Sequence, residues 1–189
     1  MCSCSSRADA SPYSLSWFSP ISAGAVWSIE PYRWRSAGIL GKTISWGLSG
    51  GAGAPVGWTQ ITKNATSKAQ LRLPIAETQS LRPIALADDS QYHVLTNITA
   101  LRTDWAAYMF DSAADRAAGF AFFFRRPHAA QASMVAGLRG LTGGASYSVE
   151  RFVGYEKAGP PEKMAGAALT ALRVALPQKG SLLLRWKRQ

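Results

Sequence analysis

The stretch "RLPIAETQSLRPIALADDSQYHVLT", residues 72–96, begins with a helical pattern and ends with an extended one. Its first half continues a segment, residues 65–82, that is rich in Ala, Gln, Lys and Arg, which predicts a helix. Pro74 favours a break of this helix into two pieces, and Pro83 is expected to end it. We therefore predict a boundary between two architectural units near residues 83–90.

The sequence after residue 85 consists of short apolar runs at intervals of roughly ten residues, separated by turn-forming residues. The pattern is typical of an antiparallel β-sandwich. The run "FAFFF" is apolar on both faces, as expected of a central strand that is covered on both sides. Leu172, Val174 and Leu176 alternate with Arg173 and Ala175, which predicts a strand with one buried face. The segment "AGPPEK" is assigned to a turn. The expected strands are the runs "YHVLT", "DWAAYMF", "GFAFFFRR", "ASMVAGL", "SYSVERF", "LRVALP" and "SLLLRWK".

The sequence before residue 65 is aromatic and punctuated by proline and glycine. Residues 1–12, "MCSCSSRADASP", contain no apolar run, so we expect a disordered N-terminus there and no secretion signal. A loop-rich segment over residues 11–36 leads to "KTISWGL" (residues 42–48), whose alternating apolar positions predict a strand. The glycines and the proline of "SGGAGAPVGW" end that strand.

The composition limits the classes of partner. The formal net charge is +10, but the basic residues are scattered, and local clusters occur only at Arg125-Arg126 and in residues 185–189. We therefore expect a solvated basic surface and no nucleic-acid partner. Cys2 and Cys4 are too close in sequence to form a disulfide with each other without strain, and no metal site or cofactor is predicted. No apolar run approaches the roughly 18 residues of a membrane helix, so no membrane association is predicted and a cytoplasmic location is the default expectation.

Several motifs follow one another as in the C-terminal part of bacterial alpha-galactosidase-like glycoside hydrolases, the melibiase group, which the chain resembles from about residue 11 onward. The motifs are "EPYRWRSAG", "ETQSLRP", "DWAAYMFD", "AGFAFFFRRP", "GLRGLTGGASYSV" and "LRVALPQKGSLLLRWKR". The resemblance implies that residues 42–48 form the last strand of a (β/α)8 barrel and residues 65–82 its last helix. The fold class expected is therefore mainly β, with a partial barrel segment over residues 13–84 and a C-terminal β-sandwich over residues 85–189.

The sequence also departs from the family pattern. Glu30 stands where the family has Asp before Pro-Tyr, and Met109 stands where it has Gln before Phe. In such enzymes the two catalytic carboxylates lie on earlier barrel strands, which this chain lacks, so no catalytic residue is assigned. The acids that do occur, Asp88-Asp89, Asp104 and Asp111, are interpreted as solvated turn or strand-end residues.

Three residues are candidate substrate contacts, because barrel active sites lie at the C-terminal ends of the strands. Trp46 would stack on a sugar ring or fill the barrel core. Trp27 lies in the loop before the last strand, and Arg35 would reach a substrate hydroxyl or tie that loop down through backbone hydrogen bonds. The partners implied are an alpha-galactoside in the full enzyme and an upstream barrel chain.

Two rival functions stay open. The chain could be a truncated or mis-started reading frame, one half of a split enzyme, or a free-standing module that binds carbohydrate or protein. "GLSGG" matches the nucleophile elbow of serine hydrolases at Ser49, with His93 or His128 as base. The helix that should follow the elbow is replaced by "AGAPVGW", and both histidines fall in the all-β region, so this reading is disfavoured.

Overall fold

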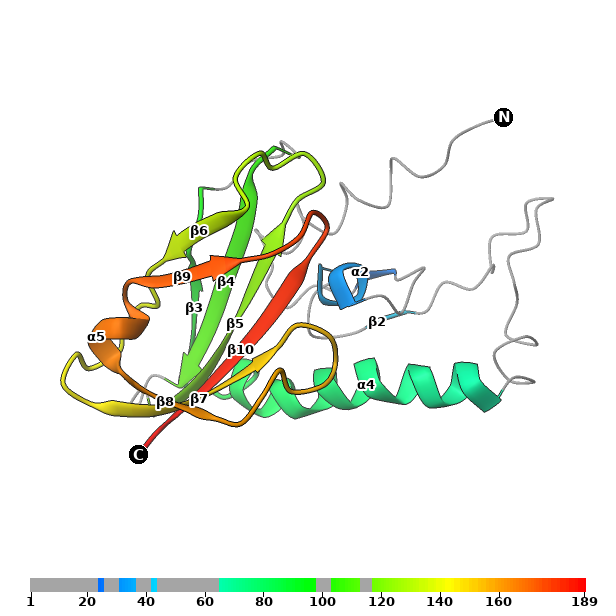
Figure 1. Cartoon of the computed structure of the whole chain (residues 1–189). Helices are drawn as coiled ribbons and strands as arrows, with labels where there is room; N and C mark the ends of the chain where they lie inside the picture. Colours follow the sequence, from blue (N-terminus) through cyan, green and yellow to red (C-terminus); the bar gives the residue numbers. More distant parts are fainter. Residues whose placement is uncertain (1–23, 26–30, 37–41, 44–64, 98–102, 113–116) are drawn as a thin grey trace. The chain divides into compact units, whose positions relative to one another are not determined.

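The structure is a computed structural model, and it describes residues 24–25, 31–36, 42–43, 65–97, 103–112 and 117–189. The chain divides into two compact units, Met1–Ser80 and Leu81–Gln189, and each is described by itself. The elements of both units are labelled in Figure 1.

The first unit contains a short parallel pair of strands, β1 (Gly24–Ala25) and β2 (Lys42–Thr43). The helix α2 (Pro31–Ser36) lies between them in the sequence. Parallel strands need a crossover connection, and a helix is its usual form. The predicted strand over residues 42–48 is described only at Lys42–Thr43, and its remainder lies outside the described residues.

Helix α4 (Ala65–Ala85) is one continuous helix of 21 residues that passes through Pro74 and Pro83. The prediction that Pro83 ends the helix was therefore wrong, and α4 is not broken into two pieces at Pro74. Each proline removes one backbone N–H donor from the helix. The residues on either side of each proline nevertheless stay helical. Leu81 and Ala85 are buried on either side of Pro83, so tertiary packing holds the last turn in helical form.

The second unit is built on an antiparallel sheet of six strands in the order β3-β4-β5-β10-β7-β8 (Figure 1). A second antiparallel pair, β6-β9, forms a separate small sheet. The mainly β, antiparallel architecture predicted from the sequence is confirmed. The strands are β3 (Ser90–Val94), β4 (Trp105–Ser112), β5 (Ala118–Arg125), β6 (Ser133–Ala136), β7 (Ser146–Phe152), β8 (Glu162–Ala165), β9 (Leu172–Ala175) and β10 (Ser181–Arg188).

The core of the second unit lies between the six-stranded sheet and the β6-β9 pair. β5 is central, flanked by β4 and β10, and all but its first residue are buried, which confirms the interpretation of "FAFFF". Ala121 and Phe123 belong to the cluster that includes Leu172 and Val174 of β9. The opposite face of the same sheet carries a run of contacting rings with centroids 5.1–6.2 Å apart. These rings belong to Tyr92, Tyr108, Phe110, Phe120, Phe122 and Phe124.

Two elements of the second unit were not predicted. β8 includes Glu162 and Lys163, which were assigned to a turn, and the short helix α5 (Gly166–Leu169) follows it directly. Three of the four β8 residues are exposed, so the strand shows no apolar alternation. Its extended form comes from backbone pairing with β7, which a periodicity of side chains cannot reveal.

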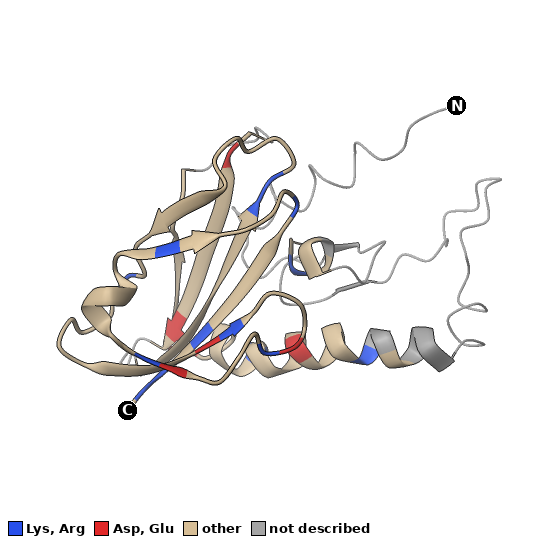
Figure 2. Cartoon of the chain, viewed as in Figure 1, with Lys and Arg blue, Asp and Glu red and all other residues tan. Residues whose placement is uncertain are grey.

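The charged residues are spread over separate strands and loops of the described chain (Figure 2). Around β7 and β8, basic residues pair with acids, as Arg151 does with Glu162 at 3.4 Å and Lys157 with Glu150. The predicted basic cluster Arg125-Arg126 does not form a surface patch, because both side chains are buried.

Candidate functional site

Arg35 is the only sequence-predicted substrate contact that falls within the described part of the chain. It lies on α2, is 1% exposed, and donates through Nε and Nη2 to the carboxylate of Glu77 on α4, at 2.8 and 2.6 Å. Beside it, Trp34 Nε1 donates to Thr78 Oγ1 at 2.9 Å. This two-point ion pair joins α2 to α4 within the first unit. A contact between Arg35 and a substrate stays a prediction.

The other predicted residues near the barrel end, Trp27, Trp46 and Ser49, lie outside the described residues. The histidines proposed as a base for Ser49 are described. His93 lies on β3, with Nε2 3.3 Å from Asp111 Oδ1, and His128 is exposed in the loop after β5.

The acids differ from the sequence interpretation at one position. Asp111 is not a solvated strand-end residue, because its side chain is fully buried in β4. Asp88 is exposed, and Asp89 accepts a hydrogen bond from Ser112 Oγ at 3.1 Å, as a turn residue can. Asp104 is half-buried at the start of β4. In the described ranges, no three His, Cys, Asp or Glu side chains are grouped so that they could hold a metal ion.

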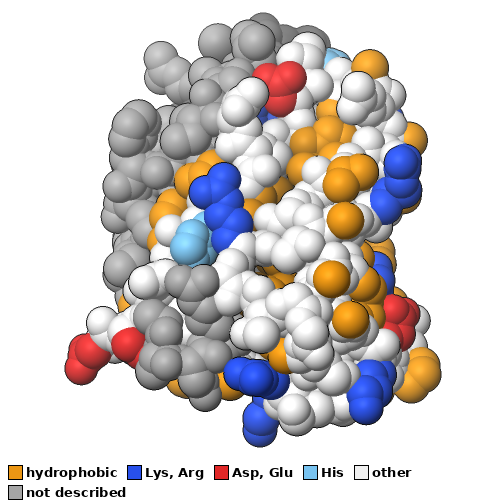
Figure 3. Space-filling view, turned by 90° about the vertical axis from the view of Figure 1, so that its left-hand side faces the viewer, with side chains coloured by type: hydrophobic (Ala, Val, Ile, Leu, Met, Phe, Trp, Pro, Cys, Tyr) orange, Lys and Arg blue, Asp and Glu red, His pale blue; other side chains and the backbone are white. Residues whose placement is uncertain are grey.

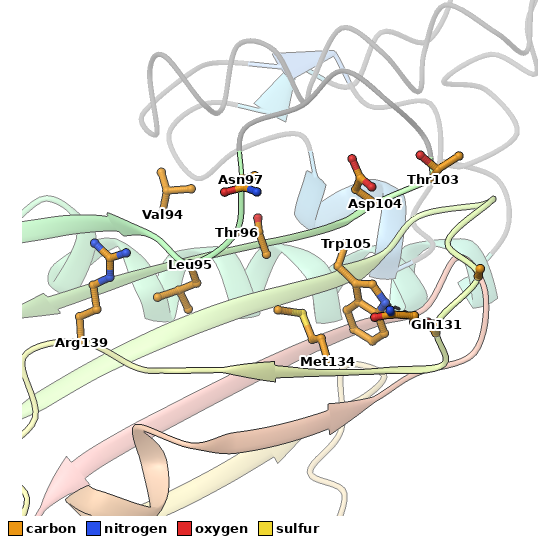
Figure 4. Close-up of a pocket in the computed structure, with 11 residues that line it drawn as sticks. Val94, Leu95, Thr96, Asn97, Thr103, Asp104, Trp105, Gln131, Met134 and Arg139 are labelled. Carbon is orange, nitrogen blue, oxygen red and sulfur yellow. Dashed lines mark hydrogen bonds between the residues drawn. The ribbon is translucent and has the colours of Figure 1, made fainter.

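The second unit contains a cavity of about 580 Å³ that the sequence did not indicate. It lies where β3 ends and β4 begins, and it extends to the loop after β5 and to β6 (Figure 4). The face that includes β6 and β9 shows hydrophobic side chains set among polar and basic ones (Figure 3). The cavity is lined by Val94, Leu95, Thr96, Asn97, Thr103, Asp104, Trp105, Ala130, Gln131, Met134 and Arg139.

The walls of the cavity are fixed by hydrogen bonds beyond the regular strand pairing. Leu95 N donates to the Ala107 carbonyl at 2.9 Å, and Ala107 N donates to Thr96 Oγ1 at 3.2 Å, so β3 stays attached to β4 past its last residue. Trp105 Nε1 donates to the Gln131 carbonyl at 2.9 Å and ties the loop after β5 to β4. These bonds hold the described walls of the cavity to β4.

Arg125 holds the same loop from the other side. Its guanidinium donates to the Ala129 carbonyl from Nε at 3.2 Å and from Nη2 at 3.0 Å. Nη1 donates to the Leu176 carbonyl, just after β9, at 2.9 Å. Because Ala130 and Gln131 follow directly, this buried arginine positions one wall of the cavity.

The cavity combines an apolar floor with polar walls. Leu95, Met134 and the largely buried ring of Trp105 supply the apolar surface. The polar side chains come from four separate stretches of the chain, around residues 97, 104, 131 and 139, so no local motif announces them. Such a mixture of an apolar surface with a few converging polar groups is typical of a small-molecule site.

Comparison with known proteins finds structural neighbours among the alpha-galactosidases. No protein-family model matches the chain, and no curated protein matches it. The chain does resemble solved structures of alpha-galactosidases, and it has an alpha-galactosidase-like fold.

Two of these structures define the extent of the likeness. The GH36 alpha-galactosidase AgaB from Geobacillus stearothermophilus is 25% identical, with a TM-score of 0.50, over 69% of this chain and 17% of that chain. The alpha-galactosidase from Lactobacillus brevis is 14% identical, with a TM-score of 0.57, over 83% of this chain and 20% of that chain. The chain thus spans a fifth or less of the length of these two enzymes.

The helices within the described ranges include none that combines the length and the apolar character needed to cross a membrane.

Proposed function

We propose that the chain supplies the C-terminal part of an alpha-galactosidase-like glycoside hydrolase, namely the end of the catalytic barrel and the β-sandwich that follows. The observation that carries this proposal is the likeness to two alpha-galactosidases over 69% and 83% of this chain, against 17% and 20% of theirs. In this proposal residues 13–84 complete the barrel and residues 85–189 form the sandwich.

The first unit supports the barrel assignment. Its parallel strand pair brackets α2, and α4 follows, which is the order of elements in a (β/α)8 barrel. Substrates bind at the C-terminal ends of barrel strands, so Trp27, Arg35 and Trp46 would contact the sugar if β2 is the last strand. Glu77 would then orient Arg35 by holding its guanidinium at two points.

The chain alone is proposed to be inactive. A retaining glycosidase needs two carboxyl groups about 5–5.5 Å apart, one as nucleophile and one as acid/base. Two described acids are poorly placed to act as catalytic carboxylates. Glu77 is paired with the Arg35 guanidinium, and Asp111 is buried beside His93. The catalytic pair would therefore come from an upstream barrel chain, which is the partner that this proposal requires.

The test is hydrolysis of an aryl alpha-galactoside. The purified chain should show no turnover above a buffer blank, and co-expression with the polypeptide encoded directly upstream should give an active complex. Glu77→Gln should lower the activity of that complex, because it removes the charge that holds Arg35. Turnover by the chain alone would contradict the proposed division of roles, and an upstream polypeptide without barrel strands would contradict the proposal itself.

A second candidate function is a free-standing module that binds carbohydrate. It is favoured by one observation, the polar cavity of the second unit. Binding of a saccharide by the purified chain, without any partner, would separate this function from the role of a purely structural C-terminal domain.

A further inference from the structure

The cavity between β3, β4 and β6 carries polar groups that the fold itself does not use. Within the described ranges, the side chains of Asn97, Thr103, Asp104, Gln131 and Arg139 line the cavity and make no hydrogen bond or ion pair. Asp104 is half-buried, and it forms no ion pair with a described cation. A ligand that donates hydrogen bonds could pair with its carboxylate.

We propose that this cavity binds a neutral oligosaccharide. Its polar groups offer both kinds of hydrogen bond that sugar hydroxyls need. Asp104 accepts only, Arg139 donates only, and Asn97, Thr103 and Gln131 do both. A hydroxyl group is at once a donor and an acceptor, and a sugar ring presents several of them in succession, so a mixed set of this kind matches it.

The apolar floor of the cavity suits the apolar face of a sugar ring, which carries C–H groups. Leu95, Met134 and Trp105 lie below Asn97, Thr103 and Asp104 in Figure 4, at about the level of Arg139 and Gln131. The C–H groups on one face of a pyranose ring pack against such a surface. The volume of about 580 Å³ lies within the range of about 300–1,000 Å³ that is usual for small-molecule sites.

The distribution of charge favours a neutral ligand over an ionic one. Among the described residues of the lining, Asp104 and Arg139 are the charged ones, and they have opposite signs. Figure 4 shows Arg139 at one end of the row of labelled residues and Asp104 with Thr103 toward the other, with Thr96 and Asn97 between them. The two charges cancel, so the described lining offers no net electrostatic attraction to an anion or to a cation.

Raffinose, an alpha-galactoside, is chosen as the first probe because of the proposed function. The proposal of a saccharide site does not rest on that function, because it is argued from the cavity alone. The experiment is a titration of the full, isotope-labelled chain with raffinose and, separately, with maltotriose, followed by amide and indole NMR signals. Binding of either sugar should shift the signals of residues 94–97, 103–105 and 130–131 and of Arg139. The indole N–H of Trp105 serves as a further reporter because it bonds to the Gln131 carbonyl.

Two variants test the assigned residues. Asp104→Asn removes the charge at nearly constant shape and is expected to raise the Kd at least about tenfold, because bonds to a charged group are the stronger ones. Asn97→Ala should raise the Kd severalfold. The matched control is Gln91→Ala, an exposed residue of β3 outside the cavity, which should leave the Kd unchanged. Each variant is first checked for the signal dispersion of the folded chain.

Several results would overturn the proposal. These are the absence of shifts with every neutral saccharide at concentrations on the order of 10 mM, shifts confined to residues outside the cavity, and an unchanged Kd in Asp104→Asn. Binding of glycylglycine in place of the sugars would assign the cavity to a zwitterionic peptide instead. Binding of maltotriose without raffinose would uphold the site and argue against alpha-galactoside recognition. None of these results depends on whether the chain takes part in catalysis.

Discussion

Replacing Arg125 by lysine is expected to lower the free energy of unfolding of the second unit by about 1.5–3 kcal/mol. The guanidinium donates to three carbonyl groups, that of Ala129 at 3.2 and 3.0 Å, that of Leu176 at 2.9 Å and, more weakly, that of Ala130 at 3.4 Å. A lysine ammonium keeps the charge but lacks the planar fork, so it cannot bond to the Ala129 and Leu176 carbonyls at the same time, and one of the two loses its donor. A hydrogen bond from a charged group contributes about 1.5–3 kcal/mol, which sets the expected loss. Arg125→Met removes all of these hydrogen bonds and should cost about 3–5 kcal/mol.

The assay is urea denaturation of the full chain followed by circular dichroism, with Arg173→Lys as the control. Arg173 is exposed and makes one bond to Ser133 Oγ at 3.2 Å, so its replacement should change stability by no more than about 0.5 kcal/mol. Arg125→Lys should also shift the indole signal of Trp105, because the loop that accepts its hydrogen bond loses an anchor. If Arg125→Lys were as stable as the wild type within about 0.5 kcal/mol, the assigned role of this arginine would be refuted.

Three further predictions concern packing, charge and pH. Gly119→Ala should destabilise the sheet by about 1–3 kcal/mol in urea denaturation, since a Cβ there would lie 2.2 Å from the Trp186 ring; equal stability would contradict this packing. Glu77→Ala should lower the stability of α4 by about 3–5 kcal/mol, measured by amide hydrogen exchange, because the Arg35 guanidinium loses its buried carboxylate; a loss under about 1 kcal/mol would argue against the pair. Burial raises the pKa of Tyr92 from 10.0 to about 12. The unfolded state therefore releases this proton first, so stability should fall as pH rises from 10 toward 12, and less so in Tyr92→Phe, as thermal melts in that range would show.

Local patterns predicted much of the second unit. The alternation of Leu172 and Val174 with exposed neighbours appears in β9 as alternating buried and exposed positions. Runs that are apolar on both faces became central strands, because only the middle of a sheet covers both sides. Sequence patterns did not predict β8, whose exposed residues are held extended by a neighbouring strand. They also predicted wrongly that the helix ends at Pro83, where buried residues on either side keep it intact.

The candidate site was much less predictable than the fold. Sequence reasoning placed it near Trp27, Arg35 and Trp46, of which the structure describes Arg35 alone. The cavity of the second unit was missed because Asn97, Asp104, Gln131 and Arg139 are distant in sequence and polar, so each looks like an ordinary surface residue. Only the pairing of β3 with β4, and the anchoring of the loop after β5, bring them together.

The sequence by itself determined the elements whose cause is local, namely most of helix α4 and the strands with a periodic apolar face. It did so because a side chain's preference for water or for the core repeats with the period of the backbone. Tertiary structure alone decided which charged groups are buried, as Arg125 and Asp111 are, and which polar side chains converge on one cavity. Both depend on contacts between residues far apart in the chain, and such contacts leave no local pattern in the sequence.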